Sequence, residues 1–434
     1  MTITAETFDR SLLAARPVRL GTVTELVGLH LLVRGLPAAV GDLVSVTTSA
    51  GPLLAEVAAL RTDGMVCLPL GATAGARVGD LVHPTGGPLR IHVGDALLGR
   101  VLDGLGRPVD GGASLDHLPA VTVDIEAPPA LSRPRITEQL GLGVRALDGL
   151  VPCGHGQRVG IMAGSGVGKS SLLSMIAHGT DADVNVIALV GERGREVREF
   201  MENDLGPEGL RRSVVVVATS DAPAVERLRA AFVATRIAES FRDSGRHVVL
   251  MMDSLTRVAM AQREIGLSAG EPPATRGYPP SVFGLLPRLL ERAGTSPLGS
   301  ITGLYTVLVE GDDLQDPIGD TARSILDGHI VLSRDLATAG HFPAIDVLES
   351  VSRVTSAVTD RHQQEDAIRL RRMLAAHRSV RELVEIGAYV NGADADADAA
   401  LQRLPRIQEF LRQPMGDVTP TAETWQRLHD LVAS

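Results

Sequence analysis

The chain has 434 residues, of which 44% are hydrophobic, 22% charged and 3% aromatic, and its formal net charge is −10. This length and composition predict a globular protein of two or three domains and exclude an intrinsically disordered chain. The acidic balance argues against a nucleic-acid partner, and the shortage of aromatic residues leaves few surfaces on which single-stranded bases could stack.

The cysteine content and the apolar runs predict the compartment. Cys67 and Cys153 are the only cysteines, too few for a disulfide framework, so we expect free thiols in a reducing cytoplasm. No apolar run approaches the roughly 18 residues that a membrane-spanning helix needs, and the first residues lack the apolar core of a signal peptide. We therefore expect a cytoplasmic protein that reaches a membrane only through a partner.

The first 17 residues place Phe8, Leu12 and Leu13 on one side of a predicted short helix. This pattern is typical of either a frayed terminus or an amphipathic segment that binds a partner. Short apolar runs separated by Gly and Pro follow, at Val18–Leu26, Leu29–Val33, Asp42–Thr47, Leu53–Leu60, Gly64–Leu70 and Asp80–Val82. Their spacing predicts a small β-barrel domain over residues 18–90.

A Gly/Pro-rich connector, residues 91–134, leads into a region where helical patterns alternate with strongly apolar runs. The apolar runs are short and rich in Val, Ile and Leu, at Val184–Val190, Ser213–Ala218, His247–Met252, Gly303–Val309 and His329–Leu332. Strands of this kind are buried on both faces, so the region predicts an α/β domain with a mostly parallel sheet. Its ligand is expected at the carboxyl ends of the strands.

One apolar run leads into the glycine-rich sequence AGSGVGKS at residues 163–170, which is followed by a helical pattern. Strand, glycine loop and helix are the elements of a phosphate-binding loop (P-loop), in which backbone N–H groups and a helix N-terminus face the phosphates of a nucleotide. Lys169 is expected to reach the β- and γ-phosphates and Ser170 to hold Mg²⁺. The predicted nucleotide-binding residues are Gly164, Ser165, Gly166, Val167, Gly168, Lys169, Ser170 and Ser171. Ala163 replaces the first glycine of the usual pattern.

The P-loop position also holds the only lysine of the chain, so 41 of its 42 basic side chains are arginine. A compact ammonium on a flexible stem is difficult to replace by a planar guanidinium where phosphates must be contacted closely. A chance survivor of compositional drift is the weaker explanation for Lys169.

Two further apolar runs end in a carboxylate. Val248–Met252 is followed by Asp253, which is predicted to hold Mg²⁺ directly or through water. Val186–Val190 is followed by Gly191 and Glu192, and a carboxylate at this place is suited to orient or deprotonate an attacking water. An alternative for Glu192 is an ion pair with one of the adjacent arginines, without a role in the chemistry.

Beyond residue 353 the strand patterns stop. Residues 360–386 and 396–412 are predicted helices, and residues 428–432 belong to a last helical segment. The Ala/Asp tract at 393–399 is predicted to be a solvated turn and not a metal site, because carboxylates at every second residue do not share one helix face.

Taken together, the sequences AGSGVGKS, GERGREV, VVLMMDSLTR and PAIDVLESVSR resemble the hexameric RecA-like ATPases, the family that includes the rotary ATP synthase subunits and the ATPases of type III export. The sequences GLLPRLLERAG, YTVLVEGDDLQDPIGD and SILDGHIVLSR are similar to the export ATPases, and ELVEIGAYVNGADADAD with IQEFLRQPM is most similar to their flagellar branch. The resemblance covers nearly the whole chain from Val18. It implies an α/β RecA-like P-loop core at 91–355, an N-terminal small β-barrel domain and a C-terminal helical domain at 356–434.

The resemblance also implies roles for single residues. Arg353 matches the arginine finger that enters the active site of the neighbouring subunit. Phe342 occupies the adenine-stacking position, although core packing would also explain an aromatic residue there. Met415 stands where the synthase β subunits carry a second aromatic residue, which leaves selectivity for adenine open. Arg193 and Arg257 match supporting positions beside the catalytic carboxylate and after the magnesium aspartate.

By resemblance, we expect a Mg²⁺-dependent ATPase that forms a homohexamer, with Lys169, Glu192, Arg193 and Arg353 in catalysis. Its implied partners are a stator-like regulatory protein at residues 1–17, the membrane proteins of the export gate, and complexes of chaperones with export substrates. The implied location is the cytoplasm, peripherally at the inner face of the cell membrane through the export apparatus.

Three alternatives remain at this point. A virulence-type secretion ATPase shares every catalytic residue. A rotary ATP synthase subunit is disfavoured because the chain is short and lacks the acidic lever sequence of β subunits, while Glu192 argues against a non-catalytic α-type subunit. An RNA helicase of the terminator-factor type is disfavoured by the acidic charge.

Overall fold

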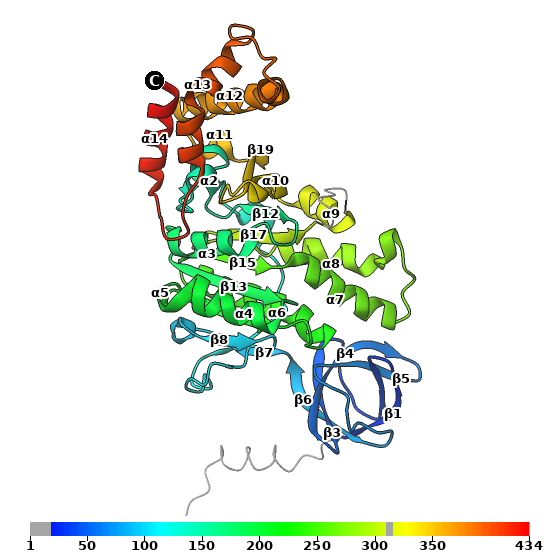
Figure 1. Cartoon of the computed structure of the whole chain (residues 1–434). Coiled ribbons are helices and arrows are strands. Elements are labelled where there is room, and N and C mark those ends of the chain that lie inside the picture. Colours follow the sequence, from blue (N-terminus) through cyan, green and yellow to red (C-terminus); the bar gives the residue numbers. More distant parts are fainter. Residues whose placement is uncertain (1–18, 310–315, 434) are drawn as a thin grey trace, which may run out of the picture. The chain divides into compact units, whose positions relative to one another are not determined.

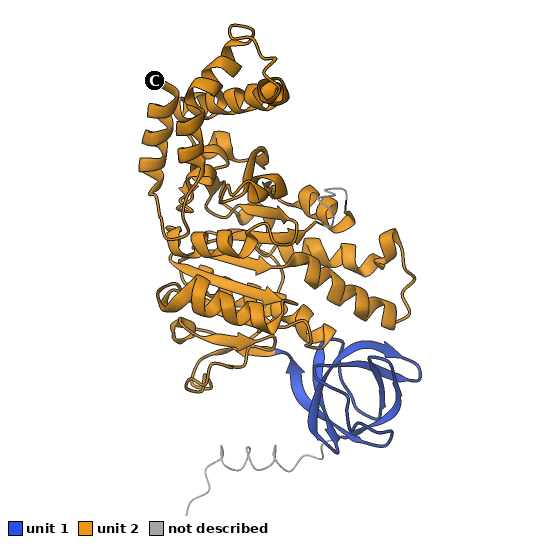
Figure 2. Ribbon diagram, viewed as in Figure 1, with its two compact units in different colours: residues 1–89 blue, residues 90–434 orange. Residues whose placement is uncertain are grey.

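A computed structural model describes residues 19–309 and 316–433, and the chain divides into two compact units, residues 1–89 and residues 90–434 (Figures 1 and 2). The predicted partner-binding segment at 1–17 lies outside the described residues.

The first unit is a closed barrel of six strands in the order β1-β2-β5-β4-β3-β6. The strands are β1 Gly21–Val27, β2 His30–Arg34, β3 Asp42–Thr48, β4 Gly51–Arg61, β5 Gly64–Pro69 and β6 Leu81–Pro88. Every second residue points inward, so that Val23, Leu31, Val44, Val57 and Cys67 are fully buried inside the barrel. The predicted barrel is therefore confirmed, although β6 extends well beyond its predicted apolar run.

The second unit is built on a sheet in the order β19-β18-β12-β17-β15-β13-β14-β8, with β16 paired to β17. The strands are β8 Val101–Asp103, β12 Arg158–Ala163, β13 Val184–Val190, β14 Ser213–Ala218, β15 His247–Asp253, β16 Gly294–Thr295, β17 Ser300–Leu308, β18 Gly328–Leu332 and β19 Ile345–Ser352. All neighbouring pairs along this order are parallel except β18 and β19. The predicted α/β core with a mostly parallel sheet is confirmed.

The connector contributes to this sheet, because its strand β8 adds to the edge at β14. Two small pairs lie outside the sheet and join β7 Arg90–His92 to β9 Ala120–Thr122 and β10 Gln139–Leu140 to β11 Cys153–Gly154. Short helical turns occur at η1 Asp95–Leu97, η2 Ala130–Ser132 and η4 Thr275–Gly277, and η3 Phe200–Leu205 is π-helical.

Helices connect the strands of the sheet (Figure 1). They are α2 Arg145–Leu150, α3 Lys169–Gly179, α4 Gly194–Glu199, α5 Gly206–Arg211, α6 Ala224–Asp243, α7 Leu255–Ser268, α8 Pro280–Leu290, α9 Pro317–Ile325 and α10 Arg334–Thr338. Helix α6 packs along β13, β14 and β15. Leu172 and Ile176 of α3 share one apolar cluster with Ile187 and Leu189 of β13, which fixes the P-loop helix on the sheet.

The chain ends in helices α11 Thr355–Val358, α12 Arg361–Glu385, α13 Ala395–Leu411 and α14 Thr421–Ala433, which confirms the predicted helical C-terminus. The predicted helix at 396–412 is confirmed and begins one residue earlier, at Ala395, so the turn predicted for the Ala/Asp tract is wrong from Ala395 onward. The Asp394 carboxylate caps the helix by accepting from the Ala397 N–H, and Asp396 and Asp398 lie in the first turn. Negative side chains there are favoured by the positive end of the helix dipole.

Arg145 in α2 joins the core to the segment between α13 and α14. Its guanidinium donates to the carbonyl oxygens of Phe410 and Arg412 and contacts the Asp417 carboxylate at 2.9 Å. Its backbone N–H donates to Oε1 of Gln413 at 2.9 Å. Arg145 itself is buried, at 4% exposure, so its polar groups need these partners, and the bonds hold the C-terminal segment on the α/β core. No described helix is long and apolar enough to cross a membrane.

Candidate active site

The P-loop begins where β12 ends and finishes where α3 begins. Gly166 and Gly168 have φ angles of 76° and 93°, in the left-handed region that glycine adopts without strain. Ala163 is the last residue of β12, pairs with Leu308 and Leu332 of the flanking strands, and is 1% exposed. Because this position has ordinary strand geometry, it does not require a glycine, and alanine fits there.

The loop leaves part of its surface open to solvent. Ser165, Gly166 and Ser170 are exposed, whereas Gly164 and Val167 are buried beneath them. Lys169 is the first residue of α3, so its side chain starts at the helix N-terminus, where N–H groups lack partners within the helix. Ser171, in the first turn, is half-buried.

Three of the predicted site residues, Lys169, Glu192 and Asp253, are in contact. Nζ of Lys169 lies 3.3 Å from Oε1 of Glu192 and forms a short contact with Oδ1 of Asp253. The side chains are 12%, 16% and 4% exposed, in the order Lys169, Glu192 and Asp253. The two carboxylates lie close together because β13 and β15 are neighbours, with Leu189 of β13 paired to Asp253 itself.

Burial raises the pKa of Glu192 above its usual 4.5, the nearby Lys169 ammonium opposes this shift, and the negative charge of Asp253 reinforces it. The alternative pairing of Glu192 with an adjacent arginine is not what the structure contains. Arg193 is largely exposed and lies 3.7 Å from Glu196. Arg257 packs its stem against Gly191, and its charge also lowers the pKa of Glu192.

The oxygen groups at this end of the sheet fit a bound magnesium ion. Asp253 supplies a buried carboxylate and Ser170 an exposed hydroxyl, both of the ligand type that Mg²⁺ prefers. Within residues 19–309 and 316–433, no group of three or more His, Cys, Asp or Glu side chains is arranged to hold a metal.

Phe342 lies next to Gly168 of the loop. A Cβ atom on Gly168 would be 3.7 Å from its ring, and the ring is 49% exposed. The Gln413 N–H donates to the Phe342 carbonyl at 3.0 Å, which ties the segment carrying Met415 to Phe342. Met415 is 42% exposed. The exposed Phe342 ring therefore lies next to the loop, and the segment that carries Met415 is bonded to the Phe342 backbone.

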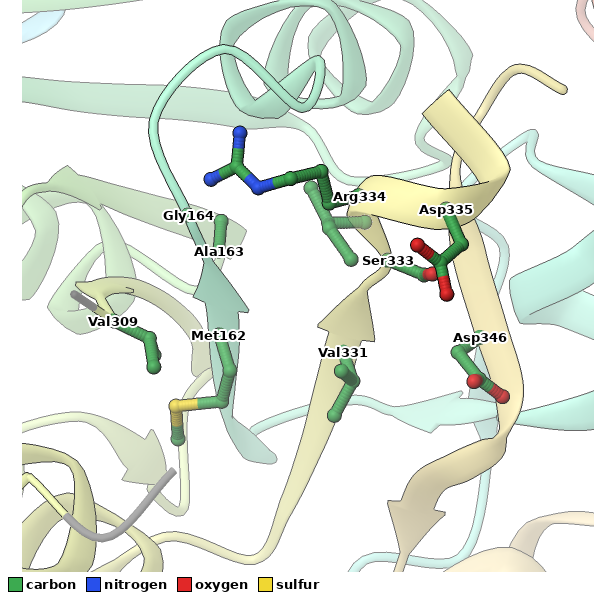
Figure 3. A pocket seen from close by; sticks show the side chains of 10 residues that line it. Met162, Ala163, Gly164, Val309, Val331, Ser333, Arg334, Asp335 and Asp346 are labelled. Atoms are coloured by element: carbon green, nitrogen blue, oxygen red, sulfur yellow. The ribbon is translucent and has the colours of Figure 1, made fainter. Parts of the chain in front are cut away.

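A pocket of about 190 Å³ lies beside the start of the P-loop (Figure 3). Its apolar floor includes Met162 and Val331, and Asp335 and Asp346 line the side away from the loop. The Arg334 guanidinium extends towards the loop and donates to the Ser165 carbonyl at 3.3 Å (Figure 3). This contact anchors the turn of the P-loop to the start of α10.

Arg353 is not near the P-loop of its own chain. Strand β19 runs antiparallel to β18. Ile345 pairs with Leu332, at the strand ends beside the P-loop, and Ser352 pairs with Gly328, at the opposite ends of the strands. The eight residues of β19 place its two ends about 23 Å apart. Arg353 is exposed there and donates to the Arg323 carbonyl at 3.3 Å.

Sequence reasoning missed two residues of this region, Arg334 and Thr306. Thr306 is fully buried and donates to Oδ1 of Asp253 at 2.8 Å. The available signal was a hydroxyl residue within the apolar run of β17. That signal could not be interpreted without knowing that β17 lies between β12 and β15.

Two family models match the chain. Residues 143–352 match the nucleotide-binding domain of the ATP synthase alpha/beta family. Residues 359–430 match the C-terminal domain of the type III secretion ATPase EscN. The first model contains the P-loop, Glu192 and Asp253, and the second contains helices α12 and α13.

Characterised relatives match over most of their length. The chain is 51% identical to the flagellum-specific ATP synthase of Bacillus subtilis over 91% of each chain. It is also 51% identical to the type 3 secretion system ATPase of Xanthomonas euvesicatoria, over 94% of this chain and 93% of that one. The structure of the assembled ATPase EscN from the type III secretion system of enteropathogenic E. coli superposes with a TM-score of 0.89 at 47% identity, covering 95% of this chain and all of EscN. A structure of EscN with its central stalk EscO matches with the same TM-score at 46% identity and the same coverage.

Proposed function

The chain belongs to the ATP synthase alpha/beta family, among the flagellar and type III secretion ATPases, and we propose that it hydrolyses Mg·ATP to drive flagellar type III protein export. The observation that carries the proposal is the meeting of Lys169, Glu192 and Asp253 at the end of the P-loop. Triphosphate hydrolysis needs a cation that binds the phosphates, a carboxylate that acts on the water and a second carboxylate that binds a metal. Lys169, Glu192 with its raised pKa, and Asp253 are these three groups.

In the proposed reaction, the P-loop N–H groups and Lys169 bind the phosphates, while Phe342 stacks on the adenine. Glu192 orients a water for in-line attack on the γ-phosphorus and accepts its proton as the bond to ADP breaks. The raised pKa of Glu192 suits this task, because a stronger base removes the proton more readily. Arg193 is assigned a supporting role at the exposed rim of the site.

Ser170 and Asp253 are the residues that would hold magnesium. Bound there, the ion would offset negative charge on the phosphate oxygens. Lys169 contacts Asp253 in this structure, so we expect Lys169 to move towards the phosphates when Mg·ATP binds. The two carboxylates would then serve separate tasks, Asp253 towards the metal and Glu192 towards the water.

Arg353 supports a site shared between subunits. Arg353 lies at the end of the strands remote from the P-loop of its own chain. An arginine finger at this position therefore has to act on a neighbouring subunit. We propose a homohexamer with active sites between subunits, in line with the assembled state named for EscN. The complex of EscN with its central stalk EscO suggests a corresponding stalk partner for this chain.

We assign the proposed domains to separate tasks. The barrel at 18–90 forms the ring, residues 91–355 hydrolyse ATP, and the helices at 356–434 face the export machinery. Residues 1–17 bind a stator-like regulator. Chaperone–substrate complexes and the membrane proteins of the export gate complete the partners, and the ring works in the cytoplasm at the inner face of the cell membrane.

The test measures phosphate release from ATP at several protein concentrations, with and without magnesium. We expect magnesium-dependent hydrolysis that rises more steeply than linearly with concentration, because sites built across an interface form only in the oligomer. A folded protein that can oligomerise but takes up no labelled ATP in the presence of magnesium would refute the proposal.

A virulence-type secretion ATPase is the second candidate, since flagellar and secretion relatives are equally identical to this chain at 51%. The catalytic residues are common to both systems and do not separate them. The neighbouring genes do: rod and hook genes support the flagellar assignment, and needle genes support the secretion system.

A further inference from the structure

Thr306 lies in the strand that separates the two strands carrying the nucleotide-binding motifs. Strand β17 has β12, which leads into the P-loop, on one side and β15, which ends in Asp253, on the other. In the registers of these pairs, Thr306 is opposite Ile161 of β12, and its neighbour Tyr305 is opposite Met252 of β15. The sheet topology therefore brings a hydroxyl group beside the carboxylate at the end of β15.

The hydroxyl group forms a specific bond to that carboxylate. Oγ1 of Thr306 lies 2.8 Å from Oδ1 of Asp253 and 3.3 Å from the Met252 carbonyl. An ionised carboxylate can only accept hydrogen bonds, so the hydroxyl is the donor. Its single proton forms the stronger hydrogen bond with the nearer, charged oxygen. Thr306 is fully buried, so removing this bond would leave a buried carboxylate oxygen without its neutral donor.

The same oxygen, Oδ1, also contacts Lys169. When Lys169 moves to the phosphates of a nucleotide, Thr306 stays in place because it belongs to a central strand. No described residue donates a hydrogen bond to Oδ2 of Asp253. A neutral donor on Oδ1 holds the carboxylate in one orientation without cancelling its charge, and it leaves Oδ2 available to a cation.

We propose that Thr306 is a positioning residue that fixes the Asp253 carboxylate for magnesium binding after Lys169 has been drawn to the nucleotide. This inference rests on the proposed function and extends it to a residue outside the P-loop and outside the two carboxylate-ending motifs. It concerns the magnesium step alone, so binding of the nucleotide phosphates without metal should not depend on Thr306.

The experiment compares Thr306→Val, which keeps the shape and removes the hydroxyl, with Thr306→Ser, which keeps the hydroxyl. Thr235→Val is the matched control, because Thr235 is also buried, at 1% exposure, and its hydroxyl donates to the Ala231 carbonyl within α6. Three quantities are measured: binding of Mn²⁺ by electron paramagnetic resonance with a non-hydrolysable ATP analogue, the magnesium concentration for half-maximal hydrolysis, and binding of the analogue in the presence of a chelator.

Thr306→Val is expected to weaken Mn²⁺ binding and to raise the magnesium requirement by about tenfold or more, the usual effect of losing a partner of a metal ligand. Analogue binding without metal should be unchanged, and Thr306→Ser and Thr235→Val should resemble the wild type. A normal metal requirement in Thr306→Val overturns the inference. Equal defects in Thr306→Val and Thr306→Ser also overturn it, because packing and not the hydroxyl would then be responsible.

If Thr306→Val does not fold, the pair Thr306→Ala and Thr306→Ser decides, since the two differ only by the hydroxyl group. Weaker Mn²⁺ binding in the alanine variant alone supports the inference, and equal binding refutes it. Failure of the proposed function gives a different result, because the wild type itself would then hydrolyse no ATP. The Mn²⁺ measurement on the variants still tests Thr306 in that case.

Discussion

Lys169 and Glu192 form an ion pair at the carboxyl end of the sheet, with 3.3 Å between Nζ and Oε1. The lysine opens α3 and the glutamate follows β13, so two separate elements supply the pair. Both side chains are mostly buried, and the ammonium stabilises the ionised carboxylate against its desolvation. A nucleotide that draws Lys169 to its phosphates would leave Glu192 a stronger base, which couples binding to activation of the water.

Replacing Lys169 by alanine should reduce ATP hydrolysis by about 100-fold or more, because charge on the phosphates would lose its cation in a water-poor site. Lys169→Arg keeps the charge, yet we expect it to be nearly as defective, since a planar guanidinium does not fit the space of an ammonium. Phosphate release at saturating Mg·ATP is the measurement. Turnover within tenfold of the wild type in Lys169→Ala would contradict the role of this residue.

Glu192→Gln should abolish turnover while preserving nucleotide binding. The amide has almost the same shape as the carboxylate but cannot accept the proton of the water, which is expected to cost about 10² to 10⁴ in rate. Phosphate release and the affinity for a fluorescent ATP analogue are measured together. Glu208→Gln is the control, because Glu208 is an exposed carboxylate that pairs with Arg211 within α5, away from the sheet end that carries Glu192. Near-normal turnover in Glu192→Gln would remove Glu192 as the catalyst.

Arg353→Ala should be inactive alone and regain activity when mixed with Lys169→Ala subunits. At an interface where the Lys169→Ala subunit presents its intact Arg353 to the intact P-loop of the other variant, the site is complete. Random mixing in equal amounts produces this arrangement at roughly a quarter of the interfaces in a ring. Phosphate release from the mixture is compared with that of each variant alone. Mixed rings that form but stay inactive would exclude a shared site completed by Arg353.

Asp148→Asn should flatten the pH dependence of stability. Asp148 is fully buried, and burial raises its pKa from 3.8 to about 7, against the N–H bonds that it accepts from Leu142 and Gly143. Between these two values the folded protein binds more protons than the unfolded chain, so this group makes stability fall as pH rises from about 4 to 7. Asparagine does not titrate and should remove that contribution.

The measurement for Asp148 is the thermal unfolding midpoint at intervals from pH 4 to pH 8. Asp63→Asn is the control, because Asp63 is exposed in a turn where asparagine is also favoured. An equal slope in the wild type and Asp148→Asn would show that Asp148 does not govern stability in this window.

Much of the fold was predictable because its signals are local. The apolar runs predicted five strands of the central sheet within a few residues, because strands buried on both faces have continuous Val, Ile and Leu. They also predicted the barrel strands except for the second half of β6, which is mostly exposed. The Asp tract at the start of α13 was mispredicted because the alternation of charge was considered without the helix dipole. Asp394 is in fact an N-cap, which the following helical pattern could have indicated.

The P-loop could be identified from the order of its amino acids, because its lysine, glycines and hydroxyl residues are contiguous and their spacing along the chain sets the shape of the loop. The sequence also indicated that Asp253 and Glu192 end strands. The packing of the domain was needed to show that both carboxylates meet Lys169 and that Thr306 is hydrogen-bonded to Asp253. It was also needed to show that β19 carries Arg353 to the end of the sheet remote from the P-loop. These contacts could not be predicted because the packing of the whole domain sets the order and direction of the strands. Strands that are neighbours in the sheet need not be neighbours in the chain.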